Sequence, residues 1–115
     1  MSSKSVFIVI PDHDIRVNLR RILETAGHFV VSAGSGGEAF LALENMSVPA
    51  IVFASSNVYM LGGEAFTTAF RAHEKYSKTP IVQVTPPNDK ISEACLVLVS
   101  PFSDHQVIAC LALCL

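Results

Sequence analysis

Residues 14–43 read DIRVNLRRILETAGHFVVSAGSGGEAFLAL, and the order of patterns within this stretch decides the fold class. Apolar side chains recur at helical spacing in its first part, at Ile15, Leu19, Ile22 and Leu23, and Gly27 follows where such a helix would end. Residues 28–33 read HFVVSA, with Val30 and Val31 at their centre, which predicts a second strand. A glycine-rich turn and a second helical pattern follow, with apolar positions at Ala39, Phe40, Leu43 and Met46.

The rest of the chain continues the same alternation. Four more apolar runs predict strands at residues 6–10, 50–54, 81–84 and 95–99. Asp12 or Asp14 is expected to cap the first helix, and Ser103 a terminal helix at residues 104–115. A third helix is expected after residue 63, with Phe66, Phe70 and His73 on its apolar side. Residues 89–94 have room for only a shortened fourth helix.

This alternation predicts one α/β domain over residues 1–115. Right-handed crossovers place the helices on both faces of a parallel sheet. We therefore expect a flavodoxin-like, doubly wound, five-stranded parallel sheet with a shortened fourth helix. Function in such sheets lies at the carboxyl ends of the strands.

Composition narrows the classes of function. Hydrophobic residues make up 50% of the chain and charged residues 16%, against about 25% charged in an average domain. The excess of apolar residues suggests surface left over for a partner. The net charge of -2 argues against nucleic acid as that partner, because nucleic-acid binding normally needs a basic patch.

Targeting features and cysteines indicate a cytoplasmic setting. No apolar run reaches the ~18–20 residues that span a bilayer, so we expect no membrane association. Pro11 and Asp12 follow the first apolar run directly, where a signal peptide would carry its cleavage region. The three cysteines are odd in number and show no metal-ligand spacing. The four histidines form no spaced cluster either, so no metal or cofactor is expected.

Several segments together resemble the receiver domains of two-component response regulators. They are residues 14–43, PAIVFASSNVYMLGGEAF at 49–66, TPIVQVT at 79–85 and LVLVSPF at 96–102. Their order and spacing carry the resemblance, which extends over nearly the whole chain. It implies the same flavodoxin-like fold and a role in phosphorelay signal transduction.

The chain departs from the receiver family at the positions that carry its phosphochemistry. The resemblance places the family's magnesium-binding acidic pair at Ile10 and Pro11, with Asp12 one position further on. The phosphoacceptor aspartate corresponds to Ser55 and the phosphoryl-pairing lysine to Ser100. The aromatic switch corresponds to Val97, and the phosphorylation-loop proline to Tyr59. Only the hydroxyl residue that ends the fourth strand is retained, as Thr85.

These departures favour a degenerate receiver, or pseudo-receiver, that is not an enzyme. It would act through protein contacts, independently of aspartyl phosphorylation. One alternative is a working receiver with a rearranged site, in which Asp12 replaces the acidic pair and Ser55 or Thr85 takes the phosphate. Another is a small-molecule sensor in the strand-end crevice, lined by Tyr59, Met60, Thr85 and Pro86. The turn at residues 34–37 is expected to be structural, because phosphate-binding turns of dinucleotide folds follow the first strand.

The last helix suggests where a partner binds. Residues 107–115 read VIACLALCL and carry no charge. Helical spacing lets one face contact the sheet, with Val107, Leu111 and Cys114 or Leu115 on it. A helix that is apolar all round is normally buried all round, so its outer face is also expected to be covered. Four interface residues are then predicted, Ile108, Cys110, Ala112 and Leu113. Their occupant would be a second copy in a dimer, another protein, or a further domain of the same signalling protein.

Overall fold

The computed structural model describes residues 4–55, 69–86 and 96–115. Within these ranges, five strands form one parallel sheet, β1 (Ser5–Val9), β2 (Phe29–Ala33), β3 (Ile51–Ser55), β4 (Ile81–Thr85) and β5 (Leu96–Val99). The strand order is β2-β1-β3-β4-β5. This confirms the predicted flavodoxin-like, doubly wound fold, and each strand end lies within one residue of its predicted position.

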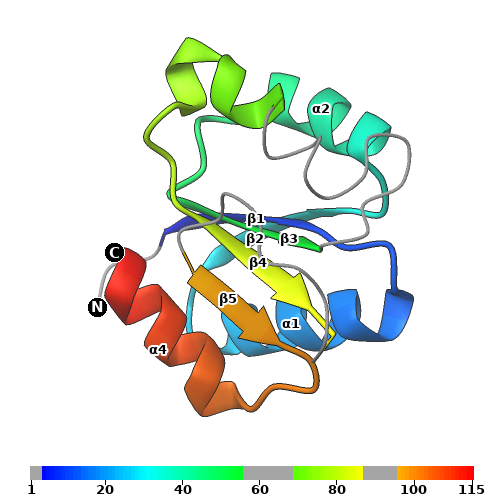
Figure 1. The fold of residues 1–115 in the computed structure, drawn as a ribbon, viewed down its shortest axis with the longest axis vertical. Helices are drawn as coiled ribbons and strands as arrows, with labels where there is room; N and C mark the ends of the chain where they lie inside the picture. Colours follow the sequence, from blue (N-terminus) through cyan, green and yellow to red (C-terminus); the bar gives the residue numbers. More distant parts are fainter. Residues whose placement is uncertain (1–3, 56–68, 87–95) are drawn as a thin grey trace.

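The helices form a layer on each side of the sheet (Figure 1). On one side lie α1 (His13–Thr25) and α4 (Asp104–Cys114), and on the other lie α2 (Gly36–Glu44) and a short 3₁₀ helix, η1 (Glu74–Tyr76). Residues 69–72 are also helical. Most of the predicted third helix, with Phe66, and the whole shortened fourth helix lie outside the described residues. No helix in the described ranges has the length and apolar character needed to cross a membrane.

The sheet separates two apolar cores because neighbouring side chains of a strand point to opposite faces. Val6 and Ile8 of β1 pack toward α1 and α4, and Phe7 and Val9 pack toward α2. All four side chains are fully buried. This burial on both faces explains why the strands read as continuous apolar runs without alternation.

Local capping explains where α1 begins and ends. The carboxylate of Asp12 accepts a hydrogen bond from the backbone N–H of Ile15 at 3.0 Å, so Asp12, and not Asp14, is the N-cap. Gly27 follows the helix with a φ of +94°, which a residue without a Cβ adopts most easily. Both ends of the helix are therefore encoded by local sequence.

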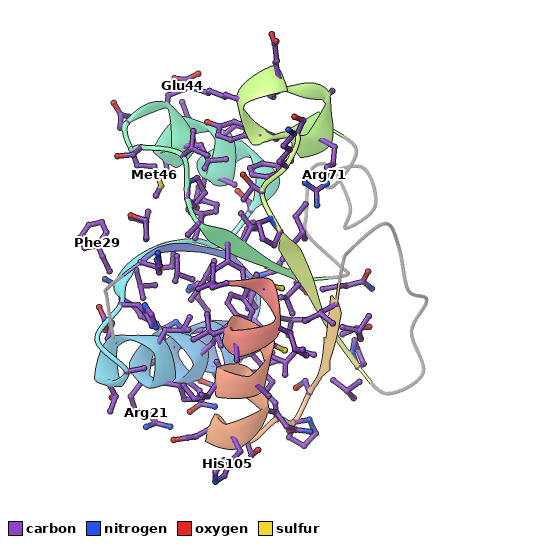
Figure 2. The ribbon with its side chains drawn as sticks, turned by 90° about the vertical axis from the view of Figure 1, so that its left-hand side faces the viewer. Arg21, Phe29, Glu44, Met46, Arg71 and His105 are labelled. Carbon is purple, nitrogen blue, oxygen red and sulfur yellow. The ribbon has the colours of Figure 1, made fainter. Side chains whose placement is uncertain are left out.

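A capping box begins α4, and an exposed ion pair joins its first turn to α1. Ser103 accepts from the backbone N–H of Gln106, whose side chain accepts in return from the N–H of Ser103. This capping box satisfies two backbone donors at the start of the helix. Arg21 of α1 lies 3.7 Å from the carboxylate of Asp104, and both side chains are exposed. Arg21 and His105 mark this side of the molecule in Figure 2.

On the opposite side, aromatic packing and one arginine hold the segment that leads into β4. Phe70 stacks on Tyr76 with ring centroids 4.6 Å apart. The guanidinium of Arg71, labelled in Figure 2, donates to the backbone carbonyls of Ser77 and Thr79 at 3.1 and 2.5 Å. His73, predicted on the apolar side of the third helix, is exposed but keeps an edge contact with Tyr76.

Candidate functional site

Most of the predicted strand-end positions line a single cleft. The cleft has a volume of about 280 Å³ and lies at the carboxyl ends of β1, β3, β4 and β5. Its lining residues are Ile10, Asp12, Ile15, Ser55, Val84, Thr85, Pro86 and Ser100. Pro11 is half-buried and is not part of this lining. The cleft thus joins residues that lie up to 90 positions apart in the chain.

Parallel pairing brings these residues together. Ser55 is the last residue of β3, and Thr85 is the last residue of β4. The backbone N–H of Ser100 donates to the carbonyl of Thr85 at 2.9 Å, which extends the β4–β5 pairing beyond the strand. The peptide bond from Ser100 to Pro101 is cis.

The hydroxyl groups of the cleft are largely withdrawn from solvent. Ser55 is 7% exposed and Thr85 is 3% exposed. The Thr85 hydroxyl donates to the backbone carbonyl of Pro86 at 3.3 Å. Val97, the predicted switch position, is half-buried on β5 and pairs with Gln83 of β4. Tyr59 and Met60 lie outside the described residues.

Among the described residues that line the cleft, only Asp12 carries a carboxylate. One of its oxygens accepts from the backbone N–H of Ile15, as described above. A carboxylate at a helix N-terminus also interacts favourably with the helix dipole. Its position is therefore explained by the start of α1 without any further ligand.

Sequence reasoning missed Arg16, whose guanidinium lies against the end of β1. Its Nη1 donates to the backbone carbonyls of Ile10 and Pro11 at 2.8 and 3.2 Å. Its Nη2 lies 3.3 Å from Nδ1 of His13. The only available signal was a basic residue in the first turns of the helix that follows the first strand, which is too common to single out.

The residues of the cleft do not fit a magnesium ion. Mg²⁺ prefers octahedral oxygen ligands and is usually anchored by one or two carboxylates. Here the single carboxylate caps a helix, and a guanidinium covers the two backbone carbonyls at the positions of the family's acidic pair. In residues 4–55, 69–86 and 96–115, no group of three or more His, Cys, Asp or Glu side chains could hold a metal ion.

Of the four residues predicted for an interface on the last helix, three are exposed and one is buried. Leu113 is 74% exposed, and Ile108 and Ala112 are also exposed. Cys110 is 7% exposed and belongs to the core beneath α4, so its predicted place on the outer face is wrong. The reason is helical spacing, because Val107, Cys110, Leu111 and Cys114 follow the i, i+3, i+4, i+7 pattern of one buried stripe.

Comparison with known proteins rests on structure alone. No family model matches the sequence, and no curated protein matches it. Chemotaxis response regulator CheY4 of Vibrio cholerae is 26% identical, with a TM-score of 0.88 over 99% of this chain and all of the other. The CheY-like response regulator receiver domain from Methylobacillus flagellatus is 23% identical, with a TM-score of 0.86 over 99% of this chain and all of its own.

Two further structures show where similar domains occur. The receiver domain of sensor histidine kinase PA1611 from Pseudomonas aeruginosa, which holds a magnesium ion in its active-site cleft, is 17% identical, with a TM-score of 0.86 over 96% of this chain and 95% of its own. NtrX from Brucella abortus is 19% identical with a TM-score of 0.90, and the match covers 98% of this chain but 27% of NtrX. On these structural matches, the chain has the fold of CheY-like response regulator receiver domains.

Proposed function

We propose that this domain is a pseudo-receiver, which signals through protein contacts independently of Mg²⁺ and of aspartyl phosphorylation. The observation that carries the proposal is that the charged side chains at the strand-end cleft are bonded to the protein's own backbone. The only carboxylate in its described lining, on Asp12, caps α1, and the Arg16 guanidinium donates to the carbonyls of Ile10 and Pro11. Receiver domains are usually not classical enzymes, and the proposal assigns this one no catalytic residue.

Phosphoryl transfer needs support that this cleft does not offer. Charge that develops on a transferred phosphoryl group is stabilised by bound Mg²⁺ and by cationic side chains directed at it. By the sequence resemblance, Ser55 corresponds to the phosphoacceptor aspartate and Ser100 to the lysine, and both serines line the cleft. Neither serine supplies the charge of the residue that it replaces.

The alternative with a rearranged phosphorylation site is less well supported. It needs Ser55 or Thr85 to act as a nucleophile, and a hydroxyl needs a base to activate it. The residues that line the cleft include no histidine and no glutamate, and Asp12 is engaged at the helix cap. Both hydroxyls are also nearly buried.

A small-molecule sensor at the same cleft remains the second alternative. Thr85 and Pro86, two of its four predicted residues, do line the cleft. The volume of about 280 Å³ lies just below the roughly 300–1,000 Å³ of common ligand sites. Saturable binding of a metabolite that Ser55→Arg abolishes would support this alternative over the pseudo-receiver.

The proposed partner is another protein or a further domain of the same signalling protein. The match to NtrX supports it, because there the receiver-like region forms only part of a longer chain. The uncharged outer face of α4, centred on Leu113, is the proposed contact surface. A homodimer through this face is the simplest such contact to test, because it needs only this chain.

The decisive experiment is a backbone-amide NMR titration with Mg²⁺ followed by beryllofluoride, a mimic of an acyl phosphate. We expect no saturable shifts at Ser55, Thr85 or Ser100. Asp12→Asn is the matched variant, because asparagine keeps the capping oxygen and removes the charge. Saturable shifts in the parent that Asp12→Asn abolishes would overturn the proposal and indicate a working, rearranged receiver.

A further inference from the structure

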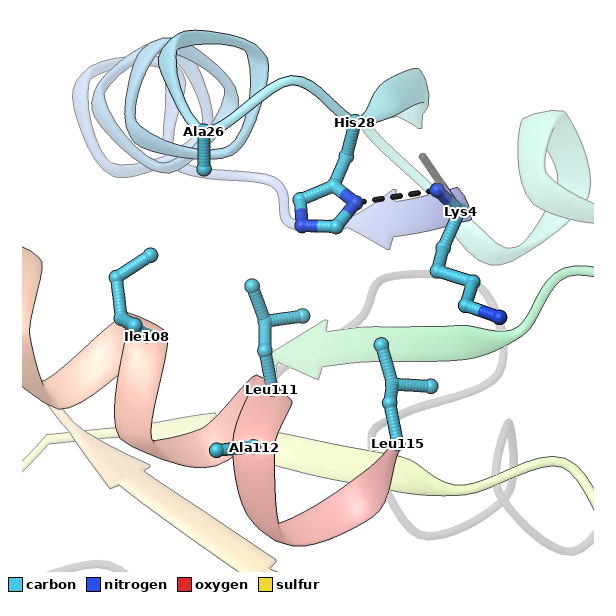
Figure 3. Close-up of a pocket in the computed structure, with 7 residues that line it drawn as sticks. All are labelled: Lys4, Ala26, His28, Ile108, Leu111, Ala112 and Leu115. Carbon is cyan, nitrogen blue, oxygen red and sulfur yellow. Dashed lines mark hydrogen bonds between the residues drawn. The ribbon is translucent and has the colours of Figure 1, made fainter. Parts of the chain in front are cut away.

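A second cavity lies at the opposite end of the sheet from the strand-end cleft. It has a volume of about 370 Å³ and is lined by Lys4, Ala26, His28, Ile108, Leu111, Ala112 and Leu115. These residues come from the start of β1, the turn after α1 and the last turns of α4 (Figure 3). The cavity is larger than the strand-end cleft. Its volume falls within the roughly 300–1,000 Å³ typical of small-molecule sites.

His28 gives this groove a hydrogen-bond donor on a mostly buried side chain. Its side chain is 7% exposed, and Nδ1 accepts a hydrogen bond from the backbone N–H of Lys4 at 3.1 Å. Because a backbone N–H can only donate, Nδ1 carries no proton and the ring's N–H is at Nε2. In Figure 3 this second nitrogen points toward the groove wall formed by Ile108 and Leu111. No residue in the described ranges accepts a hydrogen bond from it.

The rest of the lining combines an apolar wall with one positive charge. Ile108, Leu111, Ala112 and Leu115 present only hydrocarbon from α4. Lys4 is exposed, and among the described lining residues it carries the only charged side chain. An apolar groove with one imidazole N–H donor and one cationic side chain complements a ligand with an aliphatic body and an anionic, hydrogen-bond-accepting head.

We propose that this groove binds an aliphatic monocarboxylate. The carboxylate accepts from Nε2 of His28 and pairs with the ammonium of Lys4, while the alkyl chain lies along Ile108, Leu111 and Leu115. A carboxylate bonded to Nε2 of His28 would replace water at that donor, while its alkyl chain covers the apolar wall. A second copy of the chain would cover the apolar wall but would need its own acceptor aimed at His28.

The test is a calorimetric and NMR titration of the whole chain with octanoate, with octanol as the uncharged probe. We expect saturable octanoate binding with shifts at His28, Ile108 and Ala112, and binding of octanol at least about tenfold weaker, equivalent to about 1.4 kcal/mol. Lys4→Gln, which keeps the backbone N–H that bonds to His28, should weaken octanoate binding without changing octanol binding.

Two matched variants of α4 locate the site. Ala112→Phe fills the groove and should abolish octanoate binding, whereas Ala109→Phe makes the same change at an exposed position of the helix outside the groove and should leave it unchanged. Circular dichroism of both variants checks that α4 is intact.

Three results would overturn the proposal. The first is shifts that do not saturate, and the second is octanol binding as tightly as octanoate. The third is a ligand-free dimer, seen by analytical ultracentrifugation, that Ala112→Phe dissociates and Leu113→Glu does not, because the groove itself would then be covered by a second copy. None of these results bears on the strand-end cleft.

Discussion

At the scale of single residues, the role of Asp12 as a helix cap can be tested apart from any role in metal binding. Replacing Asp12 by alanine removes the acceptor of the Ile15 N–H and should lower the free energy of unfolding by about 1 kcal/mol, the usual cost of a lost N-cap. Urea denaturation measures the change. Asp14→Ala is the control, since Asp14 is exposed in the first turn and caps nothing. Equal losses in the two variants would contradict the assigned cap.

Arg16 is the second residue with a testable structural role. Arg16→Met keeps much of the side chain's length but removes the bonds to the carbonyls of Ile10 and Pro11. Hydrogen bonds that involve a charged group contribute about 1.5–3 kcal/mol, so we expect a loss of about 1.5 kcal/mol in denaturant unfolding. Arg20→Met on the same helix breaks an exposed i, i+4 pair with Glu24 and should cost less than about 0.5 kcal/mol. If both variants lose the same free energy of unfolding, the Arg16 hydrogen bonds stabilise the fold no more than an exposed ion pair does.

At this scale, the sequence predicted which residues lie at the cleft better than it predicted their hydrogen-bond partners. The positions Ile10, Asp12, Ser55, Thr85 and Ser100 were predicted to lie together, and they line one cleft. The capping bond of Asp12 was foreseen as one of two options, because N-caps depend on residues three positions apart. The Arg16 contact was not foreseen, because it depends on a long side chain turning back toward the preceding strand.

At the scale of elements, α4 shows how burial divides a helix whose last nine residues are all uncharged. Leu111 is 5% exposed and Leu113 is 74% exposed, although they lie only two positions apart. Leu111→Ala should therefore lower the free energy of unfolding by about 2–5 kcal/mol, the cost of a large-to-small change in a core. Leu113→Ala should change it by less than about 0.5 kcal/mol, as exposed substitutions usually do. Similar losses at both positions, measured by urea unfolding, would contradict the burial pattern.

The same helix shows why its buried face was harder to predict than its existence. A helix with one apolar face reveals that face in its sequence, but residues 107–115 are apolar on every side. Val107 and Leu111 were correctly predicted to face the sheet, and Cys110 was wrongly turned outward. In α1 the apolar stripe stands out against charged neighbours, and Leu19, Ile22 and Leu23 are buried as predicted.

At the scale of the whole molecule, topology was the most predictable feature. Short β-branched runs that alternate with helical patterns permit few arrangements once crossovers are right-handed, and the observed strand order is one of them. The groove at Lys4 and His28 was not predictable. It depends on how the end of α4 lies against the turn after α1, and no local sequence pattern specifies that distance.

Assembly is the remaining property of the whole molecule, and the outer face of α4 makes it testable. Leu113 is 74% exposed on a stretch of helix without charge, and burying it against a second copy would be favourable at about 25 cal/mol per Å² of apolar surface. We therefore expect a concentration-dependent dimer in analytical ultracentrifugation that Leu113→Glu dissociates. Leu41→Glu is the matched control, because Leu41 is 66% exposed on α2, on the other side of the sheet. A parent that is monomeric at every concentration, or a dimer that survives Leu113→Glu but not Leu41→Glu, would exclude α4 as the dimer contact. The partner would then have to be a different protein or a further domain.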